Sequence, residues 1–136
     1  MHKLRKICDE NCILLIFDEI QSGMGRTGKL FAFEHFDIVP DILTIGKAFG
    51  GGMPIGGFVT SQKLMSLFNN HPNLGHITTF GGHPVSCAGA LGYLNVFKSE
   101  NILQNVEIKG KLFEKLLAHS SIVEIRRKGL FFAIEM

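Results

Sequence analysis

Short apolar segments alternate with glycine-rich or charged segments along most of the chain. The unbroken apolar run at residues 12–17 is too short for a helix and does not alternate with polar residues. It therefore predicts a strand buried on both faces, as in a parallel sheet covered by helices. Residues 42–45 and 56–60 predict two further short strands, and residues 122–125 and 129–134 are also strand-like.

Apolar residues recur at helical spacing in three other segments, residues 3–10, about 84–98 and 103–117. Pro84 suits the first turn of the second helix, because the N–H that proline lacks has no intrahelical partner at that position. Ser61 can cap a short helix that follows it. Because strands and helices alternate, the pattern predicts an α/β fold with a largely parallel sheet.

Two helical segments carry more specific signals. One face of the helix at 84–98 is small, with Ala88, Gly89 and Gly92, and this predicts close approach of another backbone segment. Asn101 and Gln104 resemble a capping box at the start of the next helix.

Composition places the chain among folded globular proteins. A hydrophobic fraction of 46% with 19% charged residues excludes disorder as the main state. The net charge of +2 argues against electrostatic binding of nucleic acid. No apolar run approaches the ~18 residues that would span a bilayer, and the N-terminal segment resembles no secretory signal. The mean hydropathy of +0.22 is high for a small domain and predicts exposed apolar surface.

Three cysteines cannot all pair with one another, so a reduced, cytoplasmic protein is the simplest interpretation. We expect these residues to be small buried thiols: Cys8, Cys12 and Cys87. Several histidines lack the spacing of a metal site, and no metal is expected at them: His35, His71, His76 and His119.

Two opposite charges follow the first two predicted strands, Asp18 after the first and Lys47 after the second. Ligands bind at the carboxyl ends of strands in open α/β sheets, so both side chains can face one crevice. A simple salt bridge is the alternative. Desolvation near Gly46 and Phe49 would lower the pKa of Lys47 and leave a nucleophilic amine. Such amines form Schiff bases with carbonyls, and pyridoxal phosphate (PLP) uses that bond together with an acidic partner for its ring nitrogen.

Residues 78–84 offer hydroxyl groups, glycine backbone amides and a helix N-terminus, a combination that suits a phosphate. An ordinary loop with a helix cap explains the same residues equally well.

Gly23, Gly25 and Gly28 form a G-x-G-x-x-G pattern, which suggests a dinucleotide-binding module as a weaker alternative. In such modules the glycines follow the strand at once and open a helix. Here residues 18–22 separate the strand from the glycines, and Pro40 ends the short segment that follows. A glycine-rich turn is the favoured interpretation.

Three segments resemble signatures of the class III PLP-dependent aminotransferases. They are LIFDEIQSGMGRTG at 15–28, PDILTIGKAFGGGMPIG at 40–56 and TFGGHP at 79–84, where asparagine is more usual than His83. The family includes acetylornithine, ornithine and 4-aminobutyrate aminotransferases. The resemblance implies part of a fold-type I large domain, with a mostly parallel sheet and helices, running into the start of the small C-terminal domain.

The resemblance also implies a role for four residues. Lys47 would form the Schiff base and move the proton between the substrate Cα and the cofactor. Asp18 would pair with the pyridinium nitrogen, and Gln21 would bond near the ring's 3-hydroxyl. Thr79 would contact the phosphate in the site of a neighbouring subunit, which implies a homodimer with shared sites.

The implied reaction transfers an amino group from a small-molecule donor, an ω-amino acid or an acetylornithine-like amine, to a 2-oxo acid. Residues 1–98 would belong to the PLP-binding large domain and residues 99–136 to the small domain. Glu19 and Arg26 belong to the first motif, but the resemblance assigns them no chemical role. Family members are much longer, so we expect an internal fragment that is inactive alone and at most a weak cofactor or partner binder.

Overall fold

The computed structural model describes residues 1–69 and 77–136, and His71 and His76 lie outside the described residues. Three strands form a mixed sheet in the order β1 (Ile16–Asp18), β2 (Ile42–Ile45) and β3 (Gly57–Thr60). Strand β1 runs parallel to β2, whereas β3 runs antiparallel to β2. The β2–β3 connection is shorter than the dozen or more residues that a parallel crossover needs, which explains why the chain returns antiparallel.

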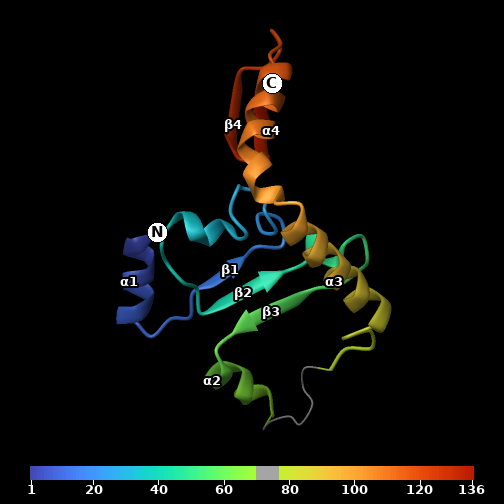
Figure 1. Cartoon of the computed structure of the whole chain (residues 1–136). Coiled ribbons are helices and arrows are strands. Elements are labelled where there is room, and N and C mark those ends of the chain that lie inside the picture. The colour runs from blue at the N-terminus through green and yellow to red at the C-terminus, as the bar shows by residue number, and fades with distance from the viewer. Residues whose placement is uncertain (70–76) are drawn as a thin grey trace.

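Helices flank this sheet, whereas the last helix and the β-hairpin that follows it project away from the sheet (Figure 1). The α-helices are α1 (His2–Glu10), α2 (Gln62–Met65), α3 (Pro84–Ser99) and α4 (Ile102–Leu116). Short 3₁₀ turns are η1 (Ala32–His35), η2 (Lys47–Gly50) and η3 (Ser66–Asn69), and the hairpin pairs β4 (Glu124–Lys128) with β5 (Phe131–Glu135). The predicted α/β class is confirmed. No α-helix within the described ranges is both long and apolar enough to cross a membrane.

The first strand is covered on one side only. Cys8 of α1 packs with Leu15 and Ile38 in a small buried cluster beside β1. In contrast, Ile13 and Ile16 are 53% and 55% exposed. Burial of this segment on both faces is therefore a wrong prediction, because α1 contributes to the core on one side and the other side stays open.

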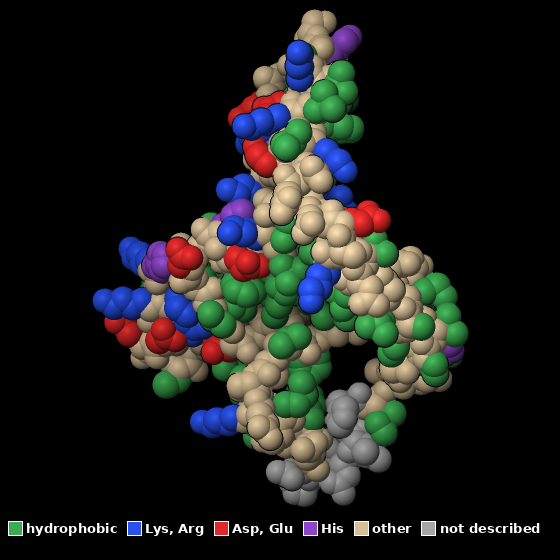
Figure 2. All heavy atoms as spheres, in the orientation of Figure 1, with side chains coloured by type: hydrophobic (Ala, Val, Ile, Leu, Met, Phe, Trp, Pro, Cys, Tyr) green, Lys and Arg blue, Asp and Glu red, His purple; other side chains and the backbone are tan. Residues whose placement is uncertain are grey.

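Apolar side chains are visible over the sheet and on the helices in the space-filling view (Figure 2). Exposed large hydrophobic residues occur in every α-helix, among them Leu4, Met65, Leu91 and Leu112. The apolar surface predicted from the mean hydropathy is therefore present.

The predictions made for the helix caps and for the small face of α3 are confirmed in part. Ser61 caps α2, where its Oγ accepts the Leu64 backbone N–H at 3.3 Å. The small face of α3 allows close approach at Gly89, whereas nothing lies within 4 Å of a Cβ placed at Gly92. The capping box is a wrong prediction, because Asn101 adopts a left-handed conformation (φ +49°) and its side chain makes no cap hydrogen bond.

All three cysteines are free thiols, but only Cys8 is buried. Cys12 lies just beyond α1 in a left-handed turn (φ +54°), and Cys87 lies on an exposed position of α3. The expected burial is therefore wrong for Cys12 and Cys87.

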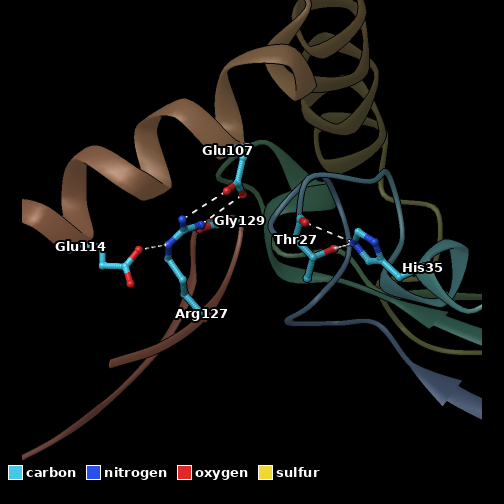
Figure 3. A network of polar contacts seen from close by, with 6 residues as sticks. All are labelled: Thr27, His35, Glu107, Glu114, Arg127 and Gly129. Atoms are coloured by element: carbon cyan, nitrogen blue, oxygen red, sulfur yellow. Dashed lines mark hydrogen bonds and ion pairs between the residues drawn. The ribbon is translucent and has the colours of Figure 1, made fainter. Parts of the chain in front are cut away.

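Helix α4 and the hairpin form one packed unit, called here the α4–hairpin unit (residues 102–135). Arg127 of β4 joins its parts, as Figure 3 shows. Its Nε donates to Glu114 Oε2 at 2.6 Å, and its two terminal nitrogens donate to the carboxylate of Glu107 at 3.1 Å. The Arg127 side chain is only 13% exposed. These bonds hold the pKa of Glu107 below its ordinary value and raise that of Arg127.

The turn of the hairpin contacts the loop that follows β1. The Leu130 N–H donates to the Arg26 carbonyl at 2.9 Å. A Cβ at Gly129 would lie 2.7 Å from the carbonyl carbon of Thr27, so only glycine fits there without a shift. The His35 ring bonds to the Thr27 backbone and hydroxyl oxygens at 3.2 and 3.1 Å on the other side of the loop (Figure 3). The hairpin turn is thereby placed beside the β1 end of the sheet.

Candidate active site

The candidate site lies where β1 and β2 end. Because these strands are parallel, their carboxyl ends meet at one edge of the sheet. Asp18 is the last residue of β1 and is aligned with Thr44 of β2. Lys47 begins η2, shortly after β2 ends.

The Asp18 carboxylate is oriented through one of its oxygens. Its Oδ1 accepts the Ile20 backbone N–H at 3.0 Å and the Thr44 hydroxyl at 3.2 Å. Its Oδ2 has no hydrogen-bond partner among the described residues. Asp18 therefore presents one fixed and one available acceptor oxygen.

Lys47 interacts with Gln21 and not with Asp18. Its Nζ donates to Gln21 Oε1 at 3.2 Å, and within residues 1–69 and 77–136 it forms no ion pair with Asp18. The simple salt bridge is therefore absent from the part of the chain that the structure describes. The backbone of Lys47 is in the left-handed region (φ +47°), which is uncommon for a non-glycine residue.

Turn η2 is held in place by close contact with α3. A Cβ at Gly51, just after η2, would lie 2.5 Å from the Gly89 carbonyl oxygen. In the same way, a Cβ at Gly89 would lie 2.8 Å from the Gly50 carbonyl oxygen. The two backbones therefore pack without intervening side chains, and this packing fixes the segment that begins with Lys47.

Two cavities open at this edge of the sheet. The first has a volume of about 330 Å³ and is lined by Asp18, Ile20, Gln21, Ser22, Lys47 and Phe131. The second has a volume of about 440 Å³ and is lined by Ile20, Gln21, Gly23, Arg26, Lys47, Ala48, Leu130, Phe131 and Phe132. The structure thus brings three predicted site residues, Asp18, Gln21 and Lys47, around one cavity.

The whole chain, residues 1–136, matches the sequence profile of the family described as Aminotransferase class-III. The chain belongs to the class-III aminotransferases. It is 44% identical to an acetylornithine aminotransferase from Caldanaerobacter subterraneus subsp. tengcongensis, across 98% of this chain and 34% of the relative. It is 41% identical to an acetylornithine aminotransferase from Methanopyrus kandleri, across 100% of this chain and 35% of the relative. The chain thus spans about a third of the length of these relatives.

Solved aminotransferase structures share the fold. The ornithine aminotransferase from Toxoplasma gondii, crystallized in the presence of oxidized glutathione with partial occupancy of PLP, superimposes with a TM-score of 0.88 at 35% identity, covering 99% of this chain and 33% of that one. The taurine:2-oxoglutarate aminotransferase from Bifidobacterium kashiwanohense, in complex with PLP and glutamate, gives 0.86 at 34% identity, covering 98% and 31%. The predicted partial fold-type I architecture is confirmed.

Lys47 of this class-III aminotransferase chain is exposed. The expectation that Gly46 and Phe49 would desolvate its amine is therefore wrong for this chain. Its Nζ bonds to the polar, exposed Gln21 in a cavity that opens to solvent.

Thr79 is not brought to this site. It lies in the exposed turn that precedes α3 and lines neither cavity. The structure therefore assembles three of the four predicted site residues of the class-III aminotransferase and leaves the fourth on the surface.

Phe131 is a cavity residue that sequence analysis missed. It lies in β5, far along the chain from Lys47, and it lines both cavities. Its only local signal is the adjacent turn at Gly129, since phenylalanine in a strand is ordinary. Its place at the candidate site follows from how the hairpin turn docks on the loop at Arg26.

The G-x-G-x-x-G glycines serve packing. A Cβ at Gly25 would lie 2.8 Å from the Phe97 ring of α3, and one at Gly23 would lie 2.6 Å from the Glu19 carbonyl oxygen. The segment is a run of turns followed by η1, so these glycines do not open an α-helix. A dinucleotide site requires glycines at a helix N-terminus, and this class-III aminotransferase chain does not have them there.

Glu19 acts as a structural anchor of the same loop. Its side chain is buried, with 3% exposure. It accepts the Ser22 hydroxyl at 2.5 Å and the Phe33 backbone N–H at 2.8 Å. Both carboxylate oxygens are therefore used to hold the loop between Asp18 and η1, which explains its place in the motif.

Proposed function

We propose that this chain carries the cofactor-holding and proton-transferring residues of a PLP-dependent transaminase. The observation that carries the proposal is the meeting of Asp18, Gln21 and Lys47 around one cavity, with Asp18 Oδ2 unpartnered among the described residues. The second candidate function is that of a truncated chain that binds the cofactor weakly without turnover, and it would use the same residues.

The residues present fit PLP. The available Oδ2 of Asp18 suits a protonated ring nitrogen, because a carboxylate stabilises a nearby positive charge. Gln21 uses its oxygen to accept from Lys47, which leaves its NH₂ group to donate to the ring's hydroxyl. Lys47 supplies a primary amine in the same cavity.

When bound, PLP supplies a ring that takes up the electron pair released as the substrate Cα–H bond breaks. Asp18 would stabilise the protonated ring nitrogen through the negative charge of its carboxylate. Lys47 would hold the cofactor through Nζ, and the same amine, when free, would act as the base and acid that moves the proton of the substrate Cα. Gln21 orients both the lysine and the ring.

Substrates and partners follow from the relatives. Acetylornithine and ornithine aminotransferases among them favour a donor with a terminal amine and a 2-oxo acid acceptor. The exposed Thr79, which lines neither cavity of its own chain, favours contact with the cofactor phosphate of a second subunit in a homodimer. A cytoplasmic location and the division at residues 98 and 99 stay predictions of the sequence.

The test uses the protein expressed from the complete reading frame that encodes this chain. After incubation with PLP and reduction with borohydride, mass spectrometry should find the cofactor on Lys47. Lys47→Ala should lose the label and reduce turnover by about 10²–10⁴-fold. Lys29→Ala is the matched control, because Lys29 is an exposed lysine of the neighbouring loop that lines neither cavity. Labelling that survives Lys47→Ala would refute the assignment.

The isolated 136-residue chain is expected to show little or no turnover with any amino donor. The reason is that it spans about a third of the length of its relatives, so substrate-binding parts that lie outside this segment do not contribute. An amino-donor assay on this chain alone checks the expectation, and measurable turnover would contradict it.

A further inference from the structure

Arg26 is a cation at the candidate site that the proposed mechanism does not use. It lines the second cavity together with Lys47, and it is exposed. Among the described residues its guanidinium makes no hydrogen bond or ion pair, whereas the other arginines, Arg5, Arg126 and Arg127, all pair with carboxylates. Its backbone is nevertheless fixed, because its carbonyl accepts the Leu130 N–H at 2.9 Å.

The two cavities meet at Lys47. They share four lining residues: Ile20, Gln21, Lys47 and Phe131. Asp18 lines only the first cavity and Arg26 lines only the second. Lys47 therefore lies between the first cavity, where the acidic Asp18 suits the cofactor's ring nitrogen, and the second cavity, where the basic Arg26 suits an anion.

The second cavity matches the chemistry of an amino acid or 2-oxo acid. Its lining contains no carboxylate, so an anion there meets no like charge from the lining. Leu130 and Phe131 of the hairpin lie on one side of this cavity and offer apolar contact to a carbon chain, whereas the Phe132 ring packs against Phe113 of α4. A carboxylate that leaves water for this cavity needs a partner, and the planar guanidinium can bind both of its oxygens at once.

We propose that Arg26 binds a carboxylate of the amino-acid or 2-oxo-acid ligand in the cavity beside Lys47. The proposal rests on the proposed transaminase function and adds a residue that holds the substrate. A guanidinium can bind either the carboxylate of the substrate or the phosphate of the cofactor, because both present anionic oxygen atoms. The experiment therefore separates these two ligands.

Glutarate is the probe, because it has two carboxylates and no amine and cannot react. Its dissociation constant is measured by calorimetry with the PLP-loaded protein from the complete reading frame. Arg26→Gln should raise that constant by about tenfold or more, the value of one charge-assisted hydrogen bond. Arg26→Lys should keep part of the affinity. Lys29→Gln, in the same loop but outside both cavities, should leave it unchanged.

Cofactor binding is measured in parallel with PLP and with pyridoxal, which lacks the phosphate. Arg26→Gln should change neither constant by more than about twofold, since the proposal places no cofactor contact at Arg26. Weaker binding of PLP with unchanged binding of pyridoxal would assign Arg26 to the phosphate and overturn the proposal.

Other outcomes are also decisive. Two results would overturn the role of Arg26 and leave the proposed function standing. One is an unchanged glutarate affinity in a folded Arg26→Gln protein. The other is the absence of glutarate binding to a wild-type protein whose Lys47 does carry the borohydride-reduced cofactor label. Absence of the borohydride label at Lys47 instead refutes the proposed function. Circular dichroism confirms that each variant is folded, and loss of glutarate binding by Arg26→Lys equal to that of Arg26→Gln would argue that a forked donor is required.

Discussion

The sheet edge (residues 15–60) and the α4–hairpin unit line the same cavities, but the contacts that place their cavity residues differ. At the sheet edge, strand pairing and backbone contacts between glycines place Asp18 and Lys47. In the α4–hairpin unit, the Arg127 guanidinium bonded to Glu107 and Glu114 holds the hairpin on its helix. The chemistry-bearing residues thus lie on tightly packed backbone, while Phe131 lies on a unit in which an ion-pair network adds to the Gly110–Gly129 backbone contact and the Phe113–Phe132 ring contact.

This difference teaches that the two halves of the site respond to different perturbations. Close backbone packing is insensitive to salt but intolerant of a single added methyl group. A partly exposed ion-pair network tolerates small changes of shape but weakens as salt screens the charges. The variants below test the catalytic role of the sheet edge, its backbone packing and the ion pairs of both regions one at a time.

The largest effect is expected from Asp18→Asn, which changes the chemistry of the sheet edge without changing its packing. Its Oδ1 contacts with Ile20 and Thr44 can persist, but the negative charge is lost. Turnover should fall by about 10²–10³-fold while borohydride still labels Lys47. Asp37→Asn, at an exposed position outside both cavities, is the control. Full activity of Asp18→Asn would remove Asp18 from the mechanism.

Gly51→Ala tests whether packing places Lys47. The new Cβ would meet the Gly89 carbonyl, and alanine would also adopt a strained φ of +60°, so we expect a loss of about 2–3 kcal/mol in the free energy of unfolding. Gly82→Ala is matched in φ, at +70°, but has nothing within 4 Å, and about 1 kcal/mol is expected there. Urea unfolding measures both. Equal losses would show that the contact with α3 is not tight.

Asp41→Asn probes how α1 is tied to the sheet edge, and its effect depends on pH. The Leu15 backbone N–H, at 2.7 Å, and then Arg5, at 2.8 Å, hold the pKa of Asp41 below its ordinary value of 3.8. The stabilisation is therefore present above that ordinary value and is lost as the pH falls through the lowered one. We expect Asp41→Asn to cost about 1 kcal/mol near pH 7.

Urea unfolding of the wild type and Asp41→Asn between neutral and acid pH measures this dependence. The difference between the two proteins should shrink as the pH drops below 4. A difference that is constant with pH would mean that the charge of Asp41 contributes nothing.

The smallest effect is expected from removing charge in the α4–hairpin unit. Arg127→Met should lower the thermal unfolding midpoint by about 2–4 °C, and about 0.5 M salt should reduce the difference from wild type. Arg126→Met is the control, because the Arg126 side chain is 59% exposed, and little change is expected. A difference that salt does not alter would show that packing of the Arg127 stem, rather than its charge, joins the unit.

Much of the fold could be predicted from local pattern. Strands β2 and β3, helices α3 and α4 and the hairpin strands lie close to the segments that periodicity indicated, because each pattern reports which residues near one another in the chain share a face. The antiparallel return of β3 and the open side of β1 could not be predicted, since both depend on what packs beside each strand.

The same division holds for the candidate site. Sequence alone determined the residue types at the two strand ends and the family motifs around them, so Asp18, Gln21 and Lys47 could be named in advance. Only the tertiary structure decided that Phe131 lines both cavities, that Arg26 lines the second and that Thr79 lines neither. The physical reason is that a cavity is formed by segments brought together from distant parts of the chain, and contacts at such separation leave no periodic trace in the sequence around either partner.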